Sequence, residues 1–121
     1  MNPTKDIGFI EACAQKAGIN ETEGLRCVRA DHGDKPLGYI LFRQIGDTVH
    51  IEAIDCQGDS PLFDGLVRSV LFTYLDSPVD KACFSDAVDE KLLREWRFIA
   101  DDTKCISSID DFMTNCKNCK S

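Results

Sequence analysis

A hairpin followed directly by a helix, at residues 38–76, is the feature that most restricts how this chain can fold. Residues 39–43 and 49–55 are rich in β-branched, aromatic and aliphatic side chains, and Gly46-Asp47 between them signals a turn. The pattern predicts two antiparallel strands. Alternation along the second strand predicts two faces, with Val49, Ile51, Ala53 and Asp55 on one and His50, Glu52, Ile54 and Cys56 on the other. Neither set is wholly polar, so we expect a central strand covered on both sides.

The helix after this hairpin has a clear start. Ser60 is a good N-cap, Pro61 suits the first helical position, and Asp64 lies near the first turn, where the helix dipole favours negative charge. Its apolar residues form two adjacent rows, Leu62, Leu66, Val70 and Tyr74 beside Phe63, Val67, Leu71 and Leu75. We therefore expect this helix to pack on the sheet.

Similar signals predict the other elements of the chain. They are a helix over residues 4–17 capped by Thr4 and ended by Gly18, strands over 25–30 and 81–84, a helix over 90–99 capped by Asp86 or Asp89, and an edge strand over 105–107. Trp96 shares a face with Leu92 and Leu93, which favours a core position over a ligand stack. At 121 residues the chain has the length of one domain, which we place at residues 1–113, followed by a tail at 114–121.

This order of elements resembles the GNAT superfamily of acyl-CoA-dependent N-acyltransferases, over roughly residues 25–113. The resemblance implies an α/β fold of the α+β type, with a mixed, mostly antiparallel, twisted sheet and helices on both faces. It also implies a shortened N-terminal part, because a complete GNAT domain usually places a strand and two helices before its second strand. The missing wall of the acceptor pocket motivates the hypothesis of a homodimer.

The resemblance also implies a site for acetyl-CoA. In that family the loop after the hairpin wraps the coenzyme A pyrophosphate with backbone N–H groups at a helix N-terminus. It implies the cofactor-binding residues Ile54, Cys56, Gly58, Asp59, Ser60, Gly65 and Leu66. Glu52 lies where some members keep the base that deprotonates an amine acceptor, and His50 on the same predicted face is its supporting partner.

Three departures from the family pattern support an alternative. Against the pyrophosphate loop only Gly65 of residues 62–67 fits, while Asp64 adds a negative charge beside a polyphosphate. Leu93 takes the place of the tyrosine that protonates the leaving thiolate. The alternative is a catalytically inactive module with a GNAT-like fold, which acts in protein interactions or in metal or redox sensing.

The seven cysteines bear on that alternative. The N-terminus lacks a secretory signal, so thiols are favoured over a disulfide framework, and Cys13, Cys27, Cys56 and Cys83 are expected in the core. Cys116 and Cys119 form a C-x-x-C with Lys117 inside it and Lys120 after it, a half-site for a metal ion with Cys105 as a third ligand, or a redox pair. A tail without function is the third possibility. The two histidines have no metal-binding spacing, and a structural role for each is the competing interpretation.

Charge and hydropathy limit the partners. The net charge is −7, from 21 acidic and 14 basic residues without a basic cluster, which argues against nucleic acid and suits an amine or another small cationic molecule. No apolar run approaches the ~20 residues that a membrane span needs. We therefore expect a cytoplasmic protein with no membrane partner.

Overall fold

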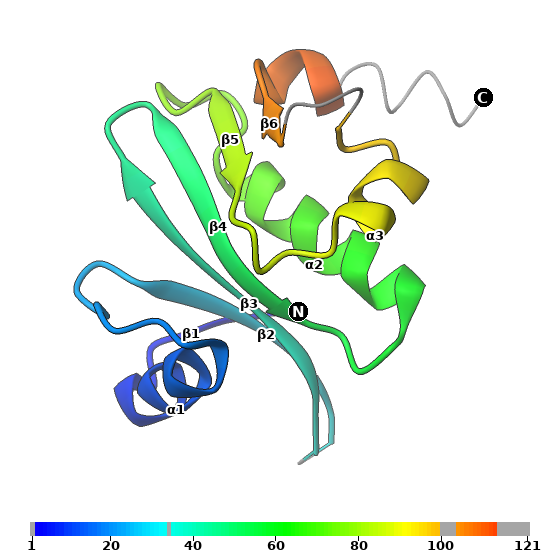
Figure 1. Cartoon of the computed structure of the whole chain (residues 1–121). Coiled ribbons are helices and arrows are strands. Elements are labelled where there is room, and N and C mark those ends of the chain that lie inside the picture. The colour runs from blue at the N-terminus through cyan, green and yellow to red at the C-terminus, as the bar shows by residue number, and fades with distance from the viewer. Residues whose placement is uncertain (1, 34, 100–103, 114–121) are drawn as a thin grey trace.

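The computed structural model describes residues 2–33, 35–99 and 104–113, which form an α+β fold around one six-stranded sheet (Figure 1). The strands lie side by side in chain order: β1 Asn2–Thr4, β2 Arg26–His32, β3 Lys35–Ile45, β4 Thr48–Asp55, β5 Lys81–Phe84 and β6 Cys105–Ile106. Every neighbouring pair is antiparallel except β4 and β5, which are parallel. The expectation of a mixed, mostly antiparallel sheet is confirmed.

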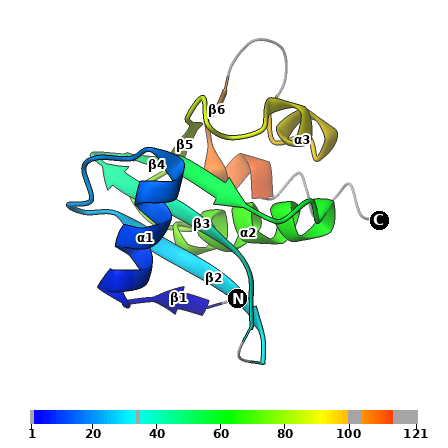
Figure 2. The same cartoon turned by 60° about the horizontal axis from the view of Figure 1, so that its bottom comes forward.

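Helices cover both faces of the sheet (Figures 1 and 2). On one face α1 (Ile7–Ala17) buries a small core consisting of Ile10, Cys13, Ala14, Leu25, Cys27, Leu41 and Ala53. The other face carries the larger core under α2 (Ser60–Thr73) and α3 (Glu90–Glu95), with Ile40, Phe42, Val49 and Ile51 from the central strands. A further helix begins at Ile109 and is described as far as Met113. Strand β4 is therefore covered on both sides, as expected.

The helix caps differ from two of the predictions. Asp6, and not Thr4, caps α1 by accepting a hydrogen bond from the Phe9 N–H at 3.1 Å, because Thr4 belongs to the short strand β1 that the sequence did not predict. Asp59, and not Ser60, caps α2, since its Oδ1 accepts from the Leu62 N–H at 3.0 Å. The cap of α3 is Asp89, one of the two candidates. That helix ends at Glu95, four residues before the predicted end at position 99.

A disulfide between Cys83 and Cys105 joins β5 to β6, so the expectation of a free core thiol at Cys83 is wrong. The two residues face each other in the antiparallel register, with their Cα atoms 4.1 Å apart. A separation of 22 residues along the chain gives no sign of this pairing. Cys13 and Cys27 are buried thiols, as expected, and Cys56 is a half-buried one.

Candidate functional site

The pairing between β4 and β5 stops before the end of β4, and the sheet is open at that point. Their pairing ends at Ile51 and Phe84, whereas β4 continues to Asp55. Ser85 closes the junction, because its N–H donates to the Ile51 carbonyl at 2.9 Å and its hydroxyl to the Glu52 carbonyl at 2.6 Å. Beyond this point, no described strand pairs with that edge of β4.

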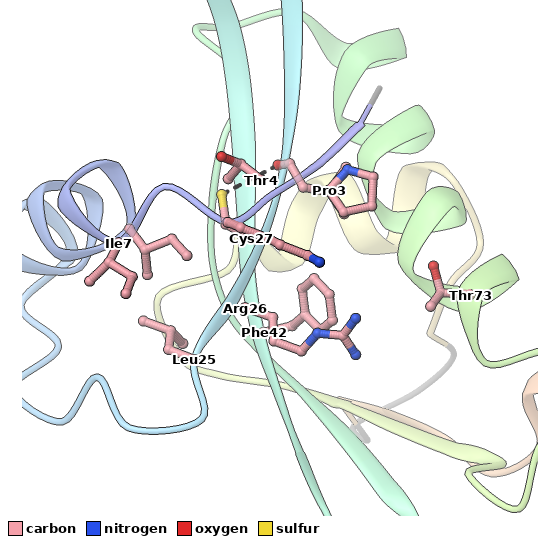
Figure 3. A pocket seen from close by; sticks show the side chains of 11 residues that line it. Pro3, Thr4, Ile7, Leu25, Arg26, Cys27, Phe42 and Thr73 are labelled. Carbon is pink, nitrogen blue, oxygen red and sulfur yellow. Dashed lines mark hydrogen bonds between the residues drawn. The ribbon is translucent and has the colours of Figure 1, made fainter.

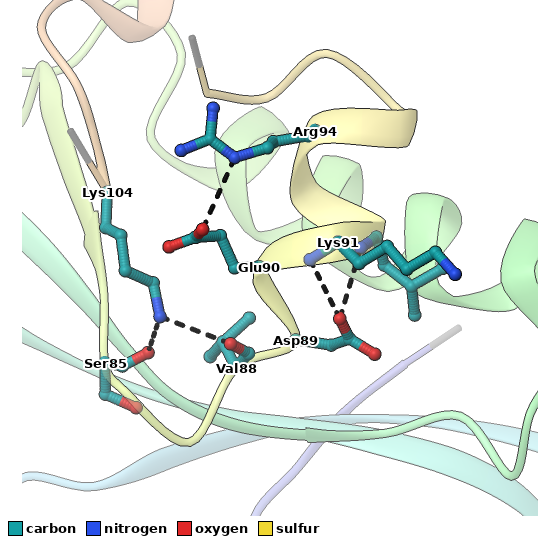
Figure 4. A network of polar contacts seen from close by, with 8 residues as sticks. Ser85, Val88, Asp89, Glu90, Lys91, Arg94 and Lys104 are labelled. Carbon is teal, nitrogen blue, oxygen red and sulfur yellow. Dashed lines mark hydrogen bonds and ion pairs between the residues drawn. The ribbon is translucent and has the colours of Figure 1, made fainter. Parts of the chain in front are cut away.

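A pocket of about 280 Å³ lies at this opening, between the end of β4, the start of α2 and the segment before α3. We call it the split pocket, lined by Ile54, Asp55, Cys56, Gln57, Gly58, Phe63, Ala87, Asp89 and Leu92. Lys104 fixes its outer wall by donating hydrogen bonds to the carbonyls of Ser85 and Val88 at 2.7 and 3.2 Å (Figure 4). Its ammonium group is thus directed at backbone carbonyls of the loop.

Three of the predicted cofactor-binding residues, Ile54, Cys56 and Gly58, line this pocket. Asp59 follows them, and Ser60 accepts a hydrogen bond from the Trp96 indole N–H at 2.8 Å, which ties α2 to the end of α3. Trp96 is half-buried and packs against the larger core, consistent with the core position expected for it.

The last two predicted residues lie further into α2. Gly65 is within the helix and is not part of the pocket lining, and Leu66 is fully buried against the sheet. The Leu66 side chain is buried because it lies in the middle of the apolar stripe of α2. The cofactor-binding role of Gly65 and Leu66 stays a prediction.

A tight turn connects the pocket to α2. The Asp59 N–H donates to the Cys56 carbonyl at 2.9 Å, and the Asp55 carboxylate accepts from the Gln57 N–H at 3.0 Å. Both central residues have positive φ, 51° at Gln57 and 79° at Gly58. Glycine adopts this conformation without strain, whereas Gln57 does so at a cost, which is common beside functional sites.

The split pocket is acidic. Asp55 and Asp89 belong to its lining, no lysine or arginine among the described residues does, and the carboxylate of Asp59 occupies the N-terminus of α2. Free N–H groups at a helix N-terminus attract phosphate, but here the Leu62 N–H is already bonded to a carboxylate. The arrangement opposes the binding of a polyphosphate inside the pocket.

A β-bulge positions the predicted base, Glu52. Leu41 pairs with Ala53 and the next residue, Phe42, pairs with Ile51, so Glu52 is the extra residue on β4. The bulge changes the phase of the strand: Val49 and Ile51 face α2, whereas Ala53 faces α1. The prediction that all three share one face is therefore wrong.

The same phase change separates Glu52 from the split pocket. Glu52 lies 3.5 Å from Arg43 Nε, and Arg43 also donates to the carbonyls of Glu21 and Glu23, in the loop after α1. Glu52 lines an open groove of about 520 Å³ together with these residues. His50 is opposite Arg43 in the β3–β4 register, next to this groove. The predicted base pair thus faces the α1 side, and Ile54 and Cys56 pack on the α2 side.

A second pocket, of about 330 Å³, lies on the α1 side at the end of β4. We call it the Tyr39 pocket, lined by Phe9, Ala12, Cys13, Lys16, Pro36, Gly38, Tyr39, Asp55 and Gln57. Asp55 and Gln57 belong to both pockets, so the two meet at the end of this strand. Burial raises the pKa of Tyr39 to about 12 and also raises that of the Cys13 thiol. Both groups are therefore uncharged at neutral pH.

Asp55 and Tyr39 were not among the site residues predicted from the sequence. Both belong to strands predicted from their apolar pattern, and that pattern says nothing about which strand end adjoins a cavity. The positive φ of Gln57 and the Gly58 turn are the local signals that could have pointed to this end of β4.

Metal binding finds no support among the residues that the structure describes, where no three His, Cys, Asp or Glu side chains are grouped for it. Cys116 and Cys119 lie outside the described residues, and the suggested third ligand, Cys105, is bonded to Cys83. Leu93, in the place of the family's tyrosine, is fully buried in α3.

Comparison with known proteins gave no relative: protein-family models, curated proteins and solved structures were each searched without a match to this chain. Within the described part of the chain, no helix combines the length and the apolar character that a membrane span requires. The geometry of the two pockets at the end of β4 is therefore the basis for a functional proposal.

Proposed function

We propose that this is an acyl-CoA N-acyltransferase-like protein that holds an acyl thioester in the split pocket and an amine acceptor on the α1 side. The observation that carries this proposal is the meeting of two pockets on opposite faces of the sheet at Asp55 and Gln57. A transfer reaction needs a donor and an acceptor to reach one point from separate binding sites. The exposed edge of β4 beyond Ile51 adds backbone groups that suit the amides of an extended donor arm.

The chemistry needs a group that takes a proton from the acceptor. The amine nitrogen attacks the thioester carbonyl and a C–N bond forms, while the proton of the amine passes to a carboxylate. The C–S bond breaks with its electron pair on sulfur, so the pantetheine arm leaves as a thiolate, and the acyl group remains on nitrogen as an amide. Asp55 adjoins both pockets, whereas the predicted base Glu52 faces the groove and is paired with Arg43. Two variants separate these roles: loss of turnover is expected for Asp55→Asn if Asp55 is the base, and for Glu52→Gln if Glu52 is.

The acidic lining makes a specific prediction about the donor. S-acetylpantetheine carries the thioester and amides of acetyl-CoA without its phosphates, so it escapes repulsion from Asp55, Asp59 and Asp89. Calorimetric titration of the full chain should show that it binds at least as tightly as acetyl-CoA. Asp59→Asn removes a charge at the start of α2 and should strengthen acetyl-CoA binding by about tenfold, equivalent to ~1.4 kcal/mol.

The control is Asp47→Asn, which removes one negative charge in the turn before Thr48, at the far end of β4. It should leave both affinities unchanged. If neither acetyl-CoA nor S-acetylpantetheine binds at about 1 mM, the donor site is refuted. If acetyl-CoA binds far more tightly than S-acetylpantetheine, phosphate recognition exists despite the carboxylates and the acidic-lining argument fails.

A non-catalytic module is the second candidate, and the Asp59 carboxylate at the α2 N-terminus favours it. That carboxylate bonds the Leu62 N–H that a phosphate would otherwise reach. This candidate predicts no thioester binding, with protein interaction or metal sensing through Cys116 and Cys119 in its place. Metal analysis of the purified chain tests the sensing version, which requires a metal stoichiometry that falls in Cys116→Ser.

The proposed homodimer is tested separately, by light scattering of the full chain. Of the described elements, β1 and α1 precede β2, and this short N-terminal part motivates the dimer hypothesis. A molar mass equal to one chain across the accessible concentration range would refute it.

A further inference from the structure

A third pocket lies at the opposite edge of the sheet, where the last residue of β1 stops one residue short of Arg26, the first residue of the antiparallel strand β2. Thr4, the last residue of β1, pairs with Cys27, so β2 has no strand neighbour on that edge at Arg26. The hollow below β1 has a volume of about 280 Å³ (Figure 3). We call it the Arg26 pocket; the lining residues used here are Lys5, Ile7, Leu25, Arg26, Phe42 and Thr73.

The Arg26 guanidinium is held in place from two sides. Its Nη1 donates a hydrogen bond to the Tyr74 hydroxyl at 3.1 Å, and its central carbon lies 5.4 Å from the centre of the Phe42 ring. Tyr74 and Phe42 themselves pack edge to face in the larger core. A guanidinium has five N–H donors, so most of them remain available beside a fixed ring. The group is therefore preorganised for an acceptor from outside.

No protein carboxylate neutralises this charge within the part of the chain that the structure describes. Four of the six arginines form an ion pair, namely Arg29 with Asp31, Arg43 with Glu52, Arg68 with Asp64 and Arg94 with Glu90. Among residues 2–33, 35–99 and 104–113, Arg26 has no such partner, and the pocket lining drawn from them contains Lys5 and no acidic residue. In a chain with a net charge of −7, this pocket is a local site of positive charge.

Apolar side chains line the other side of the pocket. Ile7 and Leu25 lie across from Arg26 and Phe42 in Figure 3, and Ile7 is 68% exposed. A ligand that covers Ile7 while it meets Arg26 would gain apolar burial and a charge-assisted hydrogen bond together.

We propose that the Arg26 pocket binds a small carboxylic acid with an apolar body. The carboxylate lies on the free N–H groups of Arg26, with Lys5 adding positive charge, and the apolar body lies against Ile7 and Leu25. A planar carboxylate matches the fork of a guanidinium with two parallel hydrogen bonds, a geometry that a single ammonium cannot offer. This site is separate from the split pocket.

The test is titration of the full chain with hexanoate, followed by calorimetry and by amide and methyl NMR shifts. Hexanoate should bind in the millimolar range or tighter, with shifts at Ile7 and Leu25. Acetate lacks the apolar body and hexan-1-ol lacks the charge, so each should bind at least about tenfold more weakly. Binding of hexan-1-ol as tight as that of hexanoate would overturn the role of the charge, and absence of hexanoate binding up to about 10 mM would overturn the site.

Two arginine variants provide the matched comparison. Arg26→Gln should weaken hexanoate binding by at least about tenfold. Arg97→Gln removes an arginine beyond the end of α3 that has no ion pair among the described residues, and it should leave hexanoate binding unchanged. Arg26→Lys keeps the charge without the fork and should bind with intermediate affinity. Thermal unfolding shows whether each variant is folded. Equal hexanoate affinity in a folded Arg26→Gln protein and in the wild type would overturn the proposal.

Discussion

The split pocket and the Arg26 pocket have the same origin and opposite chemistry. Each lies where a strand continues past the end of its neighbour: β4 past β5, and β2 past β1. Each has a volume of about 280 Å³. The first is lined by Asp55 and Asp89, and the second by Arg26 and Lys5. Unequal strand lengths thus create the hollows, and a few side chains decide the charge of what each can hold.

Helix α2 connects the two regions, because Phe63 in its first turn lines the split pocket and Thr73 at its end lines the Arg26 pocket. Leu66→Ala is therefore expected to affect both the split pocket and the Arg26 pocket. Leu66 is fully buried, so the loss of its side chain should lower the free energy of unfolding by about 2–5 kcal/mol. Urea denaturation measures this value, with Phe72→Ala as the control on the same helix. Phe72 is 67% exposed, and its loss should cost less than about 0.5 kcal/mol. Equal effects of the two variants would contradict the position of Leu66.

The disulfide should separate the two regions. Cys83→Ser with Cys105→Ser, or reduction of the wild type, should lower the free energy of unfolding by about 2–4 kcal/mol, because the bond restricts the unfolded chain. The bond lies in β5 and β6, so binding in the split pocket should weaken more than hexanoate binding in the Arg26 pocket. The double variant must not respond to added reductant. The prediction would be contradicted if reduction of the bond, verified independently, left the unfolding midpoint of the wild type unchanged.

Gly38 offers a smaller change at the end of β4. A Cβ at this position would overlap the Asp55 carbonyl oxygen and lie 3.0 Å from Leu62 Cδ2, so Gly38→Ala should shift the strand end that carries Asp55. We expect a loss of about 1–3 kcal/mol in urea denaturation and altered NMR shifts around Asp55, with those around Arg26 unchanged. Gly8→Ala in α1 is the control. Its Cβ would have ordinary contact, and it should stabilise the protein by about 0.5–1 kcal/mol. Shifts at Arg26 as large as those at Asp55 would contradict a local effect.

High pH should bring out an effect that is absent at neutral pH. Burial raises the pKa of Cys27 from its ordinary 9.0 to about 12, and that of Tyr39 from 10.0 to about 12. Above pH 9 the unfolded chain begins to lose these protons while the folded chain retains them, so stability should fall between about pH 9 and pH 12. Urea midpoints across this range test the slope, which should be shallower in Cys27→Ala. An unchanged slope in that variant would show that Cys27 does not titrate as described.

Periodicity, together with turn and cap signals, predicted most of the individual elements of this fold. The alternating apolar residues of the hairpin and the stripe of α2 reflect burial of one face, which is a local property of the sequence. Strand β5 was predicted with both of its bounds, at residues 81–84. The three-residue strand β1 is too short to show a period, and its place at the sheet edge depends on pairing with β2.

The candidate site was less accessible to such reasoning. Ile54, Cys56 and Gly58 line a pocket because they lie at a strand end followed by a turn, which the sequence indicated, although their role in cofactor binding stays a prediction. The bulge at Glu52 has no local signature, and it turned the predicted base away from that pocket. Cys83 meets Cys105 only through the pairing of β5 with β6. The register between strands that are distant in sequence cannot be read from a local apolar pattern.

The bond between Cys83 and Cys105 also makes this part of the backbone a closed ring, since residues 83–105 begin and end at the two linked sulfur atoms. Helix α3, with Asp89 before it and Leu92 within it, belongs to the ring. A protease that cuts the ring once opens it without releasing a fragment, and the two pieces separate only after reduction. Whichever single peptide bond within the ring is broken, each part of the outer wall of the split pocket therefore stays attached to the sheet by covalent bonds at one end.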